Sequence, residues 1–190
     1  MHVFTLVTRF SAVAELIDIL QAQYEFTERT LRELSRDSDD VTMASTYTVT
    51  QDMDLDEPRD SAESSLVLVN SLKDQLCDIA DVLLKAFVER KGFLELTSTT
   101  AQQQRELRAL EERYHDVRPK VIKPLVPIGR TESAFQLAEQ FGDFKSLVEL
   151  SSGLAQAPSR ARIQYYIGKF REEFAYVLFA WYIEKGAWLV

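Results

Sequence analysis

Cysteine and histidine are almost missing from this chain. Its 190 residues include one cysteine, Cys77, and two histidines, His2 and His115. A single cysteine excludes an internal disulfide and a zinc site made of several thiolates. The sequence has no His-Glu-x-x-His pair for a metal ion and no glycine-rich loop for a phosphate. It thus offers no cofactor or metal site and no base beside a nucleophile, and we expect a protein that is not an enzyme.

Glycine and proline are scarce as well, with six and five residues respectively. They are too few for the frequent tight turns of an all-β protein, so the composition favours helices. No apolar run approaches the roughly 20 residues that cross a bilayer. The N-terminal residues also lack the charged region and cleavage site of a signal peptide. These absences predict a soluble, intracellular protein.

The acidity of the chain is confined to one segment. The formal net charge is −8, and residues 36–63 alone hold nine acidic residues against two basic ones. High charge with little to bury favours disorder, so we expect 36–63 to be an acidic, flexible loop. The rest of the chain is nearly neutral and offers no broad field for nucleic acid. The basic stretch 105–130 is better explained as a solvated helix face than as an anion-binding surface.

Two long amphipathic helices are expected on either side of the acidic segment. In 3–35 and again in 64–90, apolar residues recur at alternating steps of three and four, the 3.5-residue period of helices packed lengthwise. Gly92 is expected to end the second helix. A third helix should begin near Ser98 or Thr99 and should end or kink at Pro119, because proline cannot donate a helical hydrogen bond.

Shorter helices are expected after residue 129. Gly142, Gly153 and Pro158 divide this region into four helices, the last of which stops at Lys185 and Gly186. Short helices with brief connections pack as antiparallel neighbours, which is how α-solenoids are built. The fold class is therefore all-α: an irregular α-solenoid in which two long antiparallel helices precede shorter helix pairs. We found no strict internal repeat, and we expect residues 1–190 to be a single helical stack cut from a larger protein.

The C-terminal helix is apolar nearly all round. Such a helix needs cover on every side, which a partner or a continuation of the chain could supply. The plainer interpretation is that its aromatic residues form the core. As candidates for contact with a partner or with further chain we single out six residues: Phe174, Phe179, Trp181, Tyr182, Trp188 and Leu189.

The same region resembles a segment of the 133-kilodalton nucleoporin family. The string RTESAFQLAEQFGDFKSLVEL at 130–150 is similar to a family segment in which Leu-Ala-Glu leads through an aromatic-x-Asp-Phe turn into a Leu-Val helix. RIQYY at 162–166 and FAWYIEKG at 179–186 are similar to the helices that follow it. The resemblance covers about residues 129–186, and we expect a fungal member.

The resemblance implies a structural component of the Y-shaped coat complex of the nuclear pore, at the nuclear envelope. Such a scaffold supports pore assembly and, through it, protein transport and mRNA export. Family members are much longer and carry a β-propeller before the helical stack. Their contact with the neighbouring 107-kilodalton nucleoporin (84 kilodaltons in yeast) is made by helices beyond the Trp-Tyr-x-Glu-Lys-Gly motif. Their membrane-sensing element lies in the propeller, so no membrane contact is expected from this segment. The alternative is an independent helical interaction or adaptor module unrelated to the nuclear pore.

Overall fold

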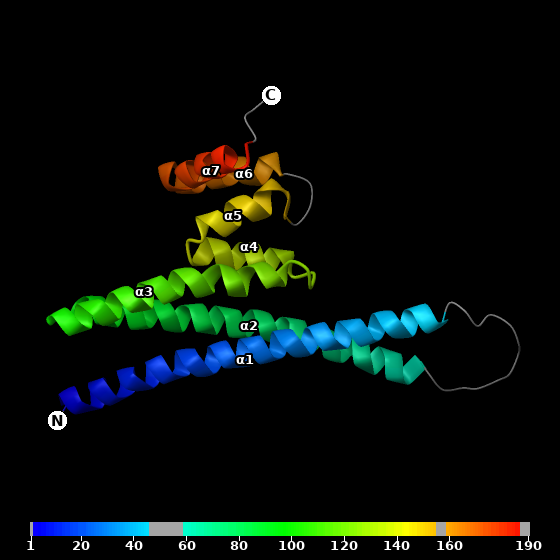
Figure 1. Cartoon of the computed structure of the whole chain (residues 1–190), viewed down its shortest axis with the longest axis horizontal. Coiled ribbons are helices and arrows are strands. Elements are labelled where there is room, and N and C mark those ends of the chain that lie inside the picture. The colour runs from blue at the N-terminus through cyan, green and yellow to red at the C-terminus, as the bar shows by residue number, and fades with distance from the viewer. Residues whose placement is uncertain (1, 46–58, 155–158, 187–190) are drawn as a thin grey trace, which may run out of the picture. The chain divides into compact units, whose positions relative to one another are not determined.

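The described part of the chain consists of helices joined by short turns (Figure 1). The computed structural model describes residues 2–45, 59–154 and 159–186, and these ranges contain no strand. The long helices are α1 (His2–Ser45), α2 (Arg59–Thr97) and α3 (Ala101–Ile122). The 3₁₀ turn η1 (Lys123–Leu125) leads to α4 (Thr131–Gln140) and α5 (Phe144–Glu149), and the π turn η2 (Leu150–Leu154) precedes α6 (Arg160–Phe170) and α7 (Glu172–Glu184). The all-α prediction is confirmed.

The chain divides into two compact units within α2. The first unit spans Met1–Ala86 and the second spans Phe87–Val190. The first contains α1 and the N-terminal part of α2, and the second contains the rest of α2 and all later helices.

The first unit is the expected pair of long helices. Ile17, Tyr24 and Leu31 of α1 are buried at seven-residue intervals, as are Leu76 and Leu83 of α2. One polar residue, Thr27, is buried in this seam, and its hydroxyl donates a hydrogen bond to the carbonyl of Gln23 at 2.9 Å. The seam is therefore apolar apart from a group that is satisfied within its own helix.

The helices extend into the segment that was expected to be a loop. Residues 36–45 belong to α1, and 59–63 belong to α2, so the bounds 36–63 were too wide. No glycine or proline occurs between residues 36 and 57, and acidic residues alone do not stop a helix that packing has begun. Residues 46–58 lie outside the described part of the chain, and for them the flexible loop stays a prediction.

The expected end of α2 at Gly92 was wrong, and α3 does not end at Pro119, where the alternative of a kink stays a prediction. Gly92 lies inside α2, which continues to Thr97, and Pro119 lies inside α3, which continues to Ile122. The backbone N–H of Lys123 donates to the carbonyl of Pro119, which closes the last turn after the proline. A glycine lowers helix propensity by only about 1 kcal/mol relative to alanine, and packing can outweigh that cost. The start of α3 agrees with expectation, since Thr100 caps it and forms a capping box with Gln103.

Candidate interaction surface

The last helix, α7, has a buried face and an exposed face, and both are apolar. Phe174 and Leu178 are 0% and 8% exposed, whereas Tyr176 is 71%, Phe179 62% and Ile183 47% exposed. The exposed residues follow one another at steps of three and four, so they form one stripe opposite the buried pair. We call Tyr176, Phe179 and Ile183 the outer stripe of α7. Exposed apolar stripes of this kind mark surfaces on which other protein packs.

The predicted contact residues are distributed over both faces. Phe179 lies in the outer stripe, and Trp181 and Tyr182 are half-buried, with ring centroids 5.3 Å apart. Phe174 is wholly buried, so its contacts are made inside the chain and it offers no outside surface. Trp188 and Leu189 lie outside the described residues.

Sequence reasoning missed two residues of the outer stripe. Tyr176 and Ile183 were not among the six candidates. Their spacing from Phe179, three residues before it and four after it, is the signal that would have found them.

The inner face of α7 packs on α5. Phe174 contacts Phe144 with ring centroids 6.5 Å apart and planes at 83°, and it contacts Tyr166 of α6 at 5.5 Å. Phe144 also contacts Phe170, at 5.0 Å. Edge-to-face and tilted aromatic pairs at such distances are favourable. This cluster of Phe144, Tyr166, Phe170 and Phe174 holds α7 on the stack and fixes which of its faces points outward.

The neighbouring helix α6 packs in the same way on α4. Arg162 pairs with Glu132, and Lys169 pairs with Glu139. Both ion pairs join residues 30 positions apart, so the two helices run in the same direction. Between the ion pairs, the ring of Tyr166 stacks on that of Phe135, with centroids 6.4 Å apart. In Figure 1 the helices of this unit follow one another from α3 through α4 and α5 to α6 and α7.

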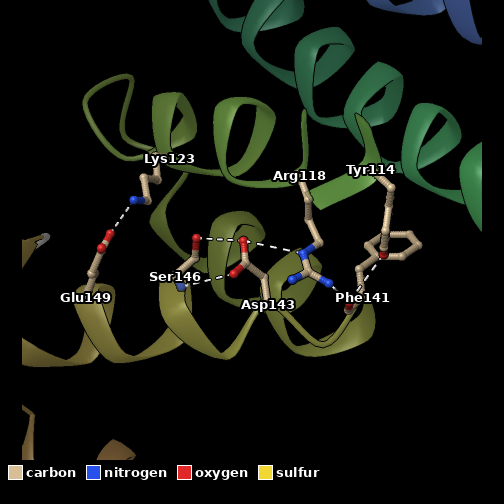
Figure 2. A network of polar contacts seen from close by, with 7 residues as sticks. All are labelled: Tyr114, Arg118, Lys123, Phe141, Asp143, Ser146 and Glu149. Carbon is tan, nitrogen blue, oxygen red and sulfur yellow. Dashed lines mark hydrogen bonds and ion pairs between the residues drawn. The ribbon is translucent and has the colours of Figure 1, made fainter. Parts of the chain in front are cut away.

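A buried polar network joins α3 to the turn between α4 and α5 (Figure 2). Asp143 is 2% exposed and caps α5, accepting hydrogen bonds from the backbone N–H of Ser146 at 3.2 Å and from its hydroxyl at 2.7 Å. The guanidinium of Arg118 lies 3.7 Å from the Asp143 carboxylate and donates to the carbonyl of Phe141 at 3.0 Å. Tyr114 donates to the same carbonyl at 3.3 Å. Lys123 and Glu149 form a second ion pair between the same two layers.

The network fixes α3 to the turn between α4 and α5, and the raised pKa of one of its members fits that role. Burial raises the pKa of Tyr114 above its ordinary value, which keeps its phenol protonated as a donor. Within the described ranges no group of His, Cys, Asp or Glu residues could hold a metal ion. His115 is on the surface, with its ring 6.0 Å from that of Tyr114. None of the described helices is both long enough and apolar enough to pass through a bilayer.

Curated proteins similar to this chain are components of the nuclear pore. The chain is 33% identical over 120 residues to the nuclear pore complex protein Nup133 of Mus musculus and 36% identical over 117 residues to that of Danio rerio. It is 28% identical over 120 residues to nucleoporin nup132 of Schizosaccharomyces pombe. The resemblance to the Nup133 family is confirmed.

These alignments cover 60–63% of this chain and about 10% of each relative. The chain thus spans about a tenth of the length of the curated relatives it matches. The aligned length exceeds that of the segment 129–186, so the similarity extends beyond the region in which it was noticed. No family model and no solved structure matches the chain.

Proposed function

We propose that this chain is a segment of a structural nucleoporin, located in the nuclear pore complex at the nuclear envelope. In this role it stacks helices, keeps neighbouring parts of the pore scaffold at a fixed separation, and performs no chemistry. The main support is its similarity to Nup133 and nup132 over 117–120 residues. The layered packing of α3 to α7 is consistent with a scaffold, because each layer is fixed to the next by ion pairs and aromatic contacts.

The proposal includes protein partners in the Y-shaped coat complex. The outer stripe of α7 is the surface that we assign to such contacts, since it is apolar and uncovered among the described residues. Contact with the 107-kilodalton neighbour is assigned to helices beyond this segment. Transport of protein and mRNA would depend on this chain only through assembly of the pore.

The test is incorporation of the chain into nuclear pores. A fluorescently tagged chain expressed in cells is expected to label the nuclear rim. Replacing Phe179 with Asp should weaken that labelling, because a charge in an apolar contact is costly to bury. Leu96→Asp is the matched control, since Leu96 is 88% exposed on α2 and lies outside the outer stripe. Diffuse fluorescence of the unaltered chain would contradict the proposal and favour the independent adaptor module.

A further inference from the structure

The helix α1 carries a second apolar stripe on the side away from its seam with α2. The seam residues Ile17, Tyr24 and Leu31 are buried. Two residues after a seam position the helix has turned by about 200°, so a side chain there points away from α2. Ile19 and Phe26 occupy such positions and are 64% and 61% exposed. Packing of α1 on α2 therefore does not account for these two large apolar side chains.

Three further exposed residues continue this line along the helix. Glu15 lies four residues before Ile19, Ala22 lies between the two apolar residues, and Arg29 lies three residues after Phe26. The steps are four, three, four and three, which keep all five side chains on one face. We call Glu15, Ile19, Ala22, Phe26 and Arg29 the back stripe of α1. Its two ends lie about 21 Å apart along the helix.

The back stripe is complementary to itself. When two copies lie antiparallel with Ala22 at the centre, Ile19 of each copy meets Phe26 of the other. Glu15 of each copy then meets Arg29 of the other, because both positions are seven residues from Ala22. A two-fold contact needs such a surface, since every residue must match the different residue that it meets in the second copy.

The sizes of the side chains fit the same arrangement. Ala22 meets Ala22 of the second copy at the two-fold axis, and two small side chains there let the helices approach to the short end of the usual 8–10 Å spacing. An apolar pair of Ile19 and Phe26 lies on each side of this centre. Association would thus cover four large apolar side chains that are each more than half exposed in the single chain.

The charges at the two ends of the stripe select the antiparallel orientation. If the two copies ran parallel, Glu15 would face Glu15 and Arg29 would face Arg29, and like charges would repel. In the antiparallel arrangement both contacts join opposite charges. Among the residues that the structure describes, neither Glu15 nor Arg29 forms an ion pair within the chain. Exposed ion pairs contribute little to the strength of a contact, but they determine its orientation and its partner.

We propose that two copies of this chain associate through the back stripes of α1, antiparallel and about a two-fold axis at Ala22. A second copy is the occupant because the stripe matches itself in both charge and size, a symmetry that no unrelated partner requires. The contact goes beyond the scaffold role, since it joins two copies of the scaffold segment to each other. Because the stripe is short, the dimer is weak, with a dissociation constant of about 10–100 μM.

Sedimentation of the whole chain at increasing concentration measures this association. Phe26→Asp should weaken it at least about tenfold, because a charge in an apolar contact is costly to bury. Val67→Asp is the matched control, since Val67 is 65% exposed on α2 and lies outside the back stripe. It should leave the association unchanged, and circular dichroism verifies that both variants remain helical. A chain that is monomeric at about 1 mM, or a dimer that Phe26→Asp does not weaken, would overturn the proposal.

Exchanging the charges tests the orientation. Glu15→Arg places like charges opposite each other at both ends of the contact, and so does Arg29→Glu, so each variant alone should associate at least about threefold more weakly. When the two variants are mixed, opposite charges meet at both ends again. Energy transfer between differently labelled copies should then show more mixed dimers than random pairing gives.

Random pairing in the mixture, or unweakened association of the single variants, would overturn the antiparallel contact. Protection of Phe26 from oxidative labelling that appears only after a different protein is added would overturn the choice of a second copy as the occupant. Labelling of the nuclear rim tests the scaffold role separately. A monomeric chain that still labels the rim refutes the dimer alone, so the two failures can be told apart.

Discussion

Phe135 of α4 and Tyr166 of α6 stack with ring centroids 6.4 Å apart and planes inclined by 21°. The guanidinium of Arg162 lies 4.0 Å from the centre of the Phe135 ring on the same interface. Both rings are almost fully buried, so this contact helps to hold α6 on α4.

Removing the Tyr166 ring should weaken the packing of α6 on α4. Tyr166→Ala is expected to cost about 3–5 kcal/mol of unfolding free energy, because it leaves a large cavity between α4 and α6. Tyr165→Ala is the matched control at the next position, where the ring is more than half exposed, and should cost less than about 1 kcal/mol. Urea denaturation of both variants measures the difference. Similar losses in the two would contradict the packing described.

Among the described polar residues, Asp143 should be the one whose substitution lowers the unfolding free energy most. Asp143→Ala removes the cap of α5 and leaves the nearly buried guanidinium of Arg118 without its counter-ion, so we expect a loss of about 3–5 kcal/mol. Ser146→Ala removes one partner of the carboxylate and should cost about 1 kcal/mol. Thermal denaturation compares them. A smaller loss for Asp143→Ala than for Ser146→Ala would show that the network is dispensable.

The turn between α6 and α7 should be improved by glycine. Arg171 has φ 51° and ψ −123°, a conformation that glycine adopts at little cost and that strains other residues by about 1–3 kcal/mol. Arg171→Gly is therefore expected to raise the unfolding free energy by about 1 kcal/mol. Arg171→Ala removes the charge but keeps the strain, so it should give no such gain. If both variants gain equally, charge and not backbone strain is the cause.

Alkaline pH should lower the unfolding free energy, because buried tyrosines have raised pKa values in the folded chain. Burial raises the pKa of Tyr166 to about 12 from an ordinary value near 10. The folded state thus retains a proton that the unfolded state loses. The stabilisation is complete below pH 10 and is lost as the pH rises from about 10 to about 12.

Unfolding measured between pH 9.5 and 11.5 should depend less steeply on pH in Tyr166→Phe than in the unaltered chain. Part of the dependence will remain, because burial also raises the pKa of Tyr24. An unchanged slope would mean that Tyr166 ionises normally.

Helical periodicity predicted most of the fold. The seam through Ile17, Tyr24 and Leu31 was visible because heptad spacing reports burial directly. The helices continue past Gly92 and Pro119 because a single breaker near a packed helix costs less than the packing gains. At both positions, packing against neighbouring helices outweighed the local preference of glycine or proline to end a helix.

The pairing of α4 with α6 could not be predicted from the sequence for a different reason. An acidic pair in α4 binds a basic pair in α6 that lies 30 positions later. Residues that pair in this way are complementary and not similar, so a search for similar residues misses them. The carboxylate of Asp143 caps α5, but its partner Arg118 comes from a different helix, and only the structure brings the two together.

Because α4 and α6 run in the same direction, a helix pair packed in this way adds one layer to the stack without reversing the direction of its helices. The layers are spaced by roughly 10 Å, the usual distance between packed helices.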